Sequence, residues 1–202
     1  MCYTPYKFVR FGTYLEGIRF MTQTIGIVVG SLRAESFSKK VANYVAGELR
    51  KKFDVKFFEI GDLPLYNEDL DHDNPPAPWV RLRDEVKNAD AFVFVTPEYN
   101  RSVPAAIKNA LDVASRPYGA NNWSGKPGAV ISVSPGALAG FGANHHLRQV
   151  ATFLNIAMMQ QPEAYIGGIY TGVDATTVTD PKVQEFLGQV VEAFEAWIAR
   201  LS

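Results

Sequence analysis

The chain has 202 residues, which is enough to bury one core and short for two domains. Its net charge of −1 gives no overall field that would attract nucleic acid or an anionic membrane, so we expect neither as a partner. A single cysteine, Cys2, excludes an intrachain disulfide and favours the reducing cytoplasm as the compartment.

The first twenty residues are rich in aromatic side chains, but they contain no apolar block of signal-peptide or membrane-spanning length. A second methionine, Met21, follows them, and the first predicted strand starts almost at once. We therefore interpret residues 1–20 as an N-terminal extension and residues 21–202 as one domain.

Strand-like and helix-like segments alternate along this domain. The predicted strands are Thr24–Val29, Val55–Glu59, Ala91–Val95, Ala129–Val133 and a fifth within Ala157–Ile166. The predicted helices are Ser38–Lys52, Trp79–Asn88, Pro104–Ser115 (capped by Ser102), His145–Asn155 and Pro181–Leu201. This alternation predicts an α/β fold, a doubly wound five-stranded parallel sheet in the order 2-1-3-4-5 with helices on both faces.

Three loops carry the chemistry of this fold. Right-handed crossovers place every strand-to-helix loop at one edge of the sheet. The loops Gly30–Ser38, Thr96–Pro104 and Ser134–Gly142 follow the first, third and fourth strands. In the predicted order the first and third strands flank the point where the winding reverses and a crevice opens. We therefore expect the three loops to converge on one pocket.

The first loop combines the hydroxyls of Ser31, Ser36 and Ser38 with the guanidinium of Arg33 at the start of a helix. Free N–H groups, hydroxyls and an arginine suit a terminal phosphomonoester. The loop lacks the second glycine of a Walker A motif and the GxGxxG pattern of dinucleotide folds. Without that pattern we expect Glu59, at the end of the second strand, to be solvated. The alternative for the loop is a capping role alone.

The second loop is stiffened by Pro97 and Pro104. Within it Tyr99 could lie against a planar ring, and Asn100 could donate to a carbonyl oxygen. The third loop has small residues that let a flat ligand approach the backbone. Ordinary packing of Tyr99 and a flexible third loop are the alternatives.

Two further features point to contacts rather than chemistry. His145 and His146 have no cysteine or acid at metal-ligand spacing, so we expect structural or subunit-contact roles. The helix Pro104–Ser115 is apolar almost all round, which indicates a partner over its outer face. The alternative is a helix tucked under loops of its own chain.

Four segments resemble, in this order, the NADPH-dependent FMN reductase family: GSLRAESFSKK, TPEYNRSVPAAIKNALDVASRP, WSGKP and HHLRQ. The resemblance spans the chain from Met21 onward and implies the flavodoxin-like fold of bacterial quinone and chromate reductases. It implies that the FMN phosphate binds to Ser31, Arg33, Ser36 and Ser38. The flavin ring would rest against Pro97, Glu98, Tyr99, Asn100 and Arg101, with Ser134 and Gly136 near its other side.

The implied activity is electron transfer from NADPH or NADH, through bound FMN, to small-molecule acceptors. Quinones are the expected acceptors, and chromate, ferric complexes and azo dyes are candidate side substrates. No protein acid or base is assigned, because the flavin carries the chemistry. Family members form dimers or pairs of dimers, so a homodimer or homotetramer is expected.

Two positions depart from the family pattern. Ser38 stands where many members carry asparagine, a change that the phosphate should tolerate. Arg101 stands where an aromatic residue is common, which makes it a candidate for an electrostatic or substrate role. Two other functions remain open from the residues. A non-enzymatic flavodoxin-type electron carrier usually has a strongly acidic surface, so the net charge and Arg33 disfavour it. A nucleotide-binding regulatory module would have no redox role.

Overall fold

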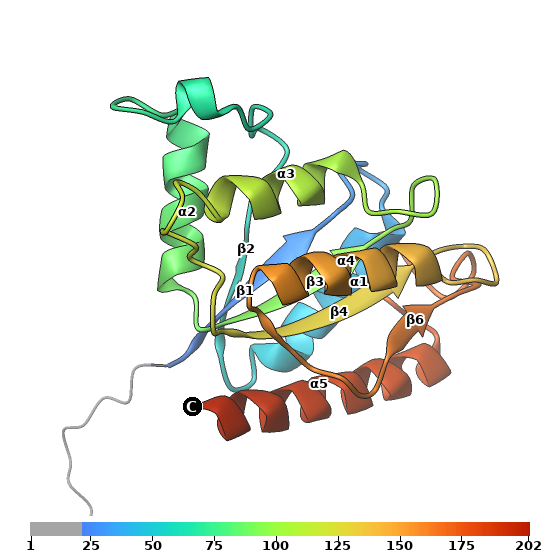
Figure 1. The fold of residues 1–202 in the computed structure, drawn as a ribbon. Coiled ribbons are helices and arrows are strands. Elements are labelled where there is room, and N and C mark those ends of the chain that lie inside the picture. Colours follow the sequence, from blue (N-terminus) through green and yellow to red (C-terminus); the bar gives the residue numbers. More distant parts are fainter. Residues whose placement is uncertain (1–21) are drawn as a thin grey trace, which may run out of the picture.

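The centre of the structure is an apolar parallel sheet with helices on both faces (Figure 1). The structure is a computed structural model that describes residues 22–202, and the extension expected at residues 1–20 lies outside this range. The strands are β1 (Thr24–Val29), β2 (Asp54–Phe57), β3 (Ala91–Thr96), β4 (Pro127–Val133), β5 (Ala157–Met158) and β6 (Ala164–Ile166). The helices are α1 (Phe37–Leu49), α2 (Ala77–Asn88), α3 (Ala105–Ala114), α4 (Phe141–Phe153), α5 (Pro181–Leu201) and a short 3-10 helix, η1 (Glu68–Leu70).

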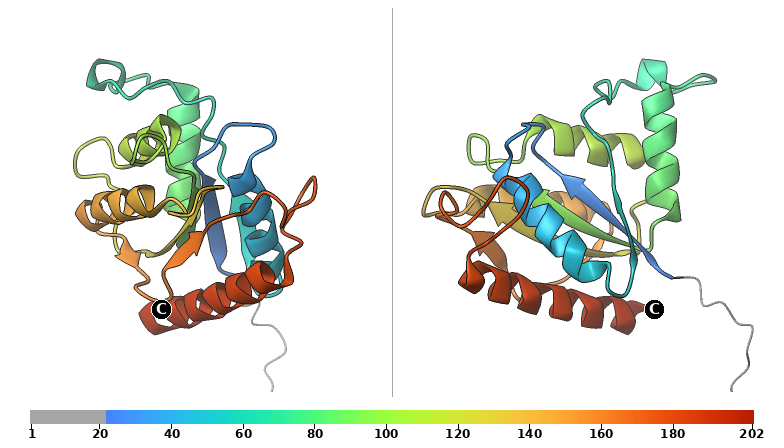
Figure 2. Two further views of the ribbon diagram at one scale, coloured as in Figure 1. Left: turned by 90° about the vertical axis from the view of Figure 1, so that its right-hand side faces the viewer. Right: turned by 180° about the vertical axis from the view of Figure 1, so that it is seen from behind.

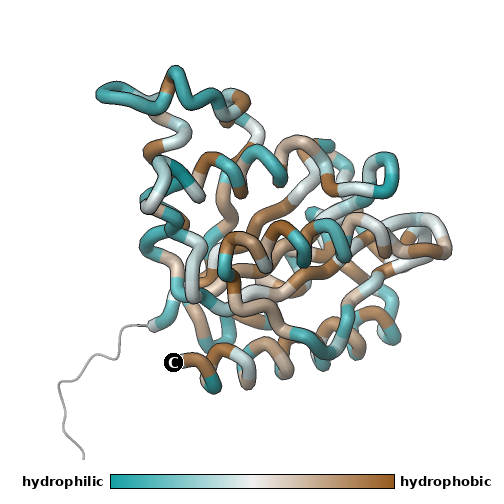
Figure 3. Tube along the Cα trace, viewed as in Figure 1, coloured by the Kyte–Doolittle hydropathy of each residue, from teal (hydrophilic) through white to brown (hydrophobic). Residues whose placement is uncertain are grey.

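The strand order is β2-β1-β3-β4-β5, and every pairing in it is parallel, which confirms the predicted doubly wound topology. All residues of β3 and β4 are buried, as expected for strands covered on both faces. Figure 3 shows the same distribution, with apolar residues along the central strands and polar residues at the loop tips.

The predicted fifth strand is in fact two short strands, and both pair with β4. Gly128 of β4 pairs with Met158, and three residues further on Ile131 pairs with Ala164, so the segment between the two short strands loops out. Pro162, which has no N–H to donate to a sheet, lies in this segment.

The helices form two layers, seen from the side in Figure 2. Helices α1 and α5 cover one face of the sheet, with Phe194 and Leu49 in that core. Helices α2, α3 and α4 cover the other face, where Trp79 and Trp123 are fully buried. Within residues 22–202, no helix has the length and apolar character needed to cross a membrane.

The starts of α4 and α3 show the clearest differences from the sequence prediction. Helix α4 begins at Phe141 rather than at His145, because Gly140 takes the left-handed conformation (φ 76°) immediately before it. Ser102 does not cap α3: Pro104 stands at the cap position without a side-chain hydrogen bond. The Ser102 hydroxyl lies instead 2.9 Å from Nδ1 of His146 on α4.

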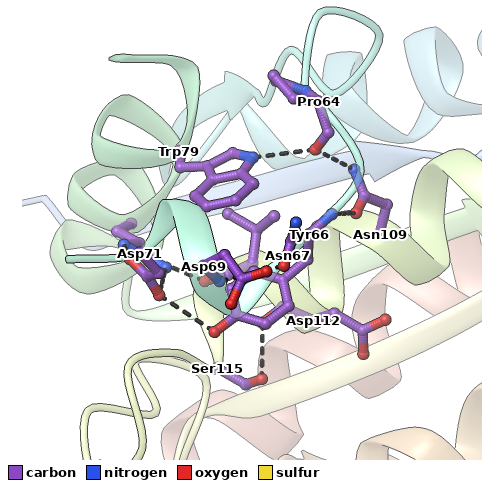
Figure 4. Close-up of polar contacts among 11 residues, drawn as sticks. Pro64, Tyr66, Asn67, Asp69, Asp71, Trp79, Asn109, Asp112 and Ser115 are labelled. Carbon is purple, nitrogen blue, oxygen red and sulfur yellow. Dashed lines mark hydrogen bonds and ion pairs between the residues drawn. The ribbon is translucent and has the colours of Figure 1, made fainter. Parts of the chain in front are cut away.

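The long loop after β2 is held in place by Asn109, a buried polar residue of α3 (Figure 4). The Asn109 Oδ1 atom accepts a hydrogen bond from the Tyr66 backbone N–H at 2.8 Å, and its Nδ2 donates to the carbonyl of Pro64 at 3.0 Å. Further along, Asp71 accepts two hydrogen bonds of 2.7 Å from the guanidinium of Arg83 on α2. These contacts attach the loop to the helices beneath it.

Candidate functional site

A pocket of about 420 Å³ lies where the loops after β1, β3 and β4 meet, at the carboxyl edge of the sheet. Its volume is within the usual range for small-molecule sites, roughly 300–1,000 Å³. The predicted convergence of the three loops is therefore found. Its lining is Ser31, Arg33, Ser36, Phe37, Ser38, Pro97, Glu98, Tyr99, Val133, Ser134, Pro135 and Tyr170.

One end of the pocket is suited to a phosphate group. Ser36 is the N-cap of α1, and its hydroxyl accepts a hydrogen bond from the Lys39 backbone N–H at 3.3 Å. Ser31 and Ser38 are only 4% and 2% exposed, yet neither hydroxyl bonds to a protein atom within residues 22–202. Both serines line the pocket, so their hydroxyls are available to a ligand. The helix N-terminus and the exposed Arg33 add positive potential there.

The first and second loops approach each other closely at Gly30. A Cβ atom at this position would lie 3.0 Å from Oγ1 of Thr96 and 3.3 Å from Cδ of Pro97. The Thr96 hydroxyl also donates to the Pro97 carbonyl at 2.8 Å. Glycine at position 30 therefore lets the phosphate end of the pocket lie against the stiff loop that follows β3.

The second loop closes in a tight turn built from two left-handed residues, Asn100 (φ 51°) and Arg101 (φ 64°). Tyr99 and Ser102 exchange backbone hydrogen bonds of 2.9 and 3.0 Å across it. Asparagine tolerates this conformation, but arginine at positive φ costs about 1 kcal/mol. The turn lies beside the pocket, and its two backbone hydrogen bonds fix the position of Tyr99, which lines the pocket.

Glu98 joins this turn to α4. Its Oε2 atom accepts a hydrogen bond from the Ala143 backbone N–H at 3.1 Å, at the positive end of the helix dipole. Its Oε1 atom lies 3.3 Å from a guanidinium nitrogen of Arg101. Helix and turn are so close that a Cβ at Gly142 would lie 2.8 Å from the Arg101 carbonyl oxygen. The pocket wall is thus rigid on this side.

Eight of the eleven residues expected at the flavin site line this pocket, and three do not: Asn100, Arg101 and Gly136. The Arg101 side chain is 71% exposed and pairs with Glu98 at the rim. The Gly136 N–H donates a hydrogen bond to the Ser134 hydroxyl oxygen at 3.1 Å, which shapes the third loop from within.

Sequence reasoning missed Tyr170, an aromatic residue of the pocket wall that is 67% exposed. It packs edge-on against Phe37, with ring centroids 5.6 Å apart. The available signal was its position: it follows β6, so its loop reaches the same sheet edge as the other three.

The two histidines are exposed, and each makes a hydrogen bond within the chain. His145 Nε2 lies 3.1 Å from the Tyr165 hydroxyl, and His146 bonds to Ser102 as described above. No group of three or more potential metal-ligating side chains occurs in the part of the chain that the structure describes.

The outer face of α3 is less apolar than its sequence indicated. Most of its apolar side chains, including Ile107 and Leu111, are buried within the chain itself. Lys108 and Asp112 form an ion pair of 2.7 Å on its outer side. A larger hollow of about 1,100 Å³ runs between α3 and α4, and its lining includes Lys108, Arg116 and Phe153.

Comparison with known proteins agrees with this geometry. Residues 23–171 match the model of the NADPH-dependent FMN reductase family. A quinone reductase of Pseudomonas putida is 51% identical over 175 residues, covering 87% of this chain and 94% of that protein. A 2-hydroxy-1,4-benzoquinone reductase of a Burkholderia species is 41% identical, covering 88% of this chain and 97% of that protein.

Among solved structures, the flavoenzyme NAD(P)H:(acceptor) oxidoreductase FerB from Paracoccus denitrificans superposes with a TM-score of 0.83 and 40% identity. The match covers 88% of this chain and 98% of FerB. The resemblance noted in the sequence is thus confirmed over most of its length, and the chain belongs to the NADPH-dependent FMN reductase family.

Proposed function

We propose that this protein is an FMN-dependent NAD(P)H oxidoreductase that reduces quinones. The supporting observation is the loop pocket, where three serines and Arg33 lie next to the stiff turn that presents Tyr99. Family membership and the quinone reductase relatives support the same reaction class. The cytoplasm, where NAD(P)H is available, is the proposed compartment.

In this proposal Ser31, Arg33, Ser36 and Ser38 hold the FMN phosphate, because the pocket end offers hydroxyls without protein partners and a positive helix terminus. Pro97, Glu98 and Tyr99 form one wall of the ring site, with Ser134 opposite. Asn100 and Gly136 would act through backbone groups next to the pocket. When bound, FMN supplies the redox chemistry, taking electrons from a nicotinamide and passing them to the acceptor.

Arg101 is proposed to act at the rim of the site on anionic substrates. Its guanidinium is exposed and only partly compensated by Glu98. Arg101→Ala should leave FMN bound but slow flavin reduction by NADH or NADPH several-fold in stopped-flow experiments. Unchanged rates and unchanged salt dependence with both nucleotides would show that Arg101 has no such role.

We further propose that the protein is a homodimer, alone or as half of a tetramer, with the hollow between α3 and α4 in the interface. Tyr118 and Phe153 at this hollow are 94% and 90% exposed, unusual for large aromatic side chains. A second copy of the chain would cover them.

The experiment that tests the function starts from the purified full-length protein. After FMN titration, anaerobic addition of NADPH should bleach the visible absorbance of the oxidised flavin. Added 1,4-benzoquinone should then restore it, and steady turnover should follow. A protein that binds FMN but is not reduced by NADPH or NADH would instead be an electron carrier. A protein that binds no FMN would contradict the flavin site itself.

A further inference from the structure

A second pocket, of about 640 Å³, lies on the other side of the phosphate-binding loop, next to the edge strand β2. Ser31 lines both pockets, so the two adjoin at the phosphate end of the proposed FMN site. The walls come from α1, from the end of β1 and from the residues after β2. Nothing in the proposed flavin site uses this space.

One wall carries an unpaired cation. Lys39 and Asn43 are one turn apart on α1 and both line the pocket. The ammonium group of Lys39 has no ion-pair partner within residues 22–202, whereas its neighbour Lys40 pairs with Glu35 at 3.3 Å. The Asn43 side chain is oriented by a 2.8 Å hydrogen bond from its Nδ2 to the Thr176 carbonyl, which leaves Oδ1 as an acceptor.

The opposite wall carries a carboxylate at the end of the edge strand. Glu59 accepts a hydrogen bond at Oε1 from the Gly61 N–H at 2.8 Å, and this contact fixes the side chain. A Cβ at Gly61 would lie 2.9 Å from this same oxygen and 3.2 Å from Cδ2 of Leu32. The Glu59 and Leu32 side chains thus lie close against the backbone at Gly61.

Apolar surface lies between the two charged walls. Leu32 is 55% exposed and Phe57 is 39% exposed, and both line the pocket. The pocket thus presents a cation, an apolar surface and a carboxylate acceptor. This set matches a phosphate, a purine ring and the hydroxyls of a ribose.

We propose that this second pocket binds the adenosine phosphate end of a dinucleotide. In dinucleotide-binding doubly wound folds, which carry a GxGxxG loop that this chain lacks, an acidic residue further along the chain accepts a hydrogen bond from the adenosine ribose. Glu59 would take that role here, and Lys39 would pair with a phosphate. Glu59 is exposed to solvent, as expected, and the proposal gives this exposed carboxylate a ligand. The inference rests on the proposed FMN site, because the shared Ser31 connects the two pockets.

Two ligands carry this chemistry: the nicotinamide dinucleotide and FAD. In the first case the adenosine belongs to the passing co-substrate. In the second it belongs to the resident flavin, whose adenylate would continue from the phosphate at Ser31 into the second pocket. The binding groups are the same, so the source is decided by experiment.

The direct test is calorimetric titration of the FMN-loaded protein with adenosine 2′,5′-bisphosphate. Lys39→Gln removes the pocket cation, and Lys40→Gln is the matched control with the same charge change on the neighbouring residue. The proposal expects Lys39→Gln to weaken binding of the probe about tenfold, the effect of losing one charge-assisted contact. Lys40→Gln should change it less than about twofold, as expected for a surface pair.

Two further measurements separate the sources. If the adenosine belongs to the co-substrate, Lys39→Gln raises KM for NADPH with little change in kcat. If it belongs to the flavin, Lys39→Gln lowers the affinity of the apoprotein for FAD relative to FMN.

Equal behaviour of the two lysine variants in all three measurements would overturn the inference. Wild-type protein that binds FMN but not the adenosine probe, and does not prefer FAD, would overturn it while leaving the proposed function intact. Failure of the wild type to bind any flavin would overturn both.

Discussion

Replacing Arg33 by alanine tests the phosphate end of the loop pocket directly. Arg33 lines the pocket from an exposed loop position and has no ion-pair partner within the described residues. Its removal therefore breaks no contact that holds the fold together. We expect the free energy of unfolding of the apoprotein to change by less than about 0.5 kcal/mol.

The expected loss of FMN affinity follows from the contacts that remain. The three serine hydroxyls and the N-terminus of α1 still bind the phosphate, so only the guanidinium contact is lost. A hydrogen bond to a charged group contributes about 1.5–3 kcal/mol. This range corresponds to an increase in Kd of roughly 10- to 150-fold. The solvent exposure of Arg33 favours the lower end, because water screens the pair.

The assay is a titration of the apoprotein with FMN, in which binding is measured as quenching of the flavin fluorescence. Arg200→Ala is the control, because it removes the same charge at the last turn of α5. That end of the helix lies near the start of β1, where Gln23 donates a hydrogen bond to Ser202, and so at the sheet edge opposite the pocket. This control should leave Kd unchanged. If Arg33→Ala binds FMN with wild-type affinity, the phosphate does not bind at this loop and the site assignment is wrong.

Three further predictions follow. Tyr170→Ala should speed FMN release several-fold in stopped-flow displacement, because Tyr170 covers the pocket against Phe37, while the equally large but remote change Tyr118→Ala should not. Hydrogen bonding to the Arg83 guanidinium lowers the pKa of Asp71. The ion pair therefore stabilises the fold fully above the pKa of the unfolded chain, about 3.9. This stabilisation is lost as the pH falls through the lower pKa of the folded state. Asp71→Asn should lower the free energy of unfolding by about 3 kcal/mol at pH 7. In urea titrations, the variant should also lose less stability than the wild type as the pH falls below about 4; an equal loss in both proteins contradicts the assignment. Phe153→Glu should convert the dimer to monomer in sedimentation without loss of fold, and a wild type that is already monomeric at micromolar concentration rules out the proposed interface.

Some polar contacts were invisible in the sequence because their partners are far away along the chain. Asn109 reads as a polar residue inside an apolar helix, but its partners Pro64 and Tyr66 are more than forty residues earlier. Ser102 has the position of a helix cap, yet it bonds to His146 on another helix. Local pattern reports which backbone conformation a segment prefers, and it contains no information about such distant partners.

The sequence by itself determined the alternation of strands and helices, the order of the sheet and the convergence of the three loops, because the period of apolar residues and the handedness of crossovers are local rules. It also singled out Ser31, Arg33, Ser36 and Ser38, which the structure places in one pocket. Only the tertiary structure decided that β5 and β6 share β4, that Tyr170 joins the pocket, and that Lys39 and Glu59 line a second one. These features depend on how separate segments pack against each other, and packing is a property of the whole chain.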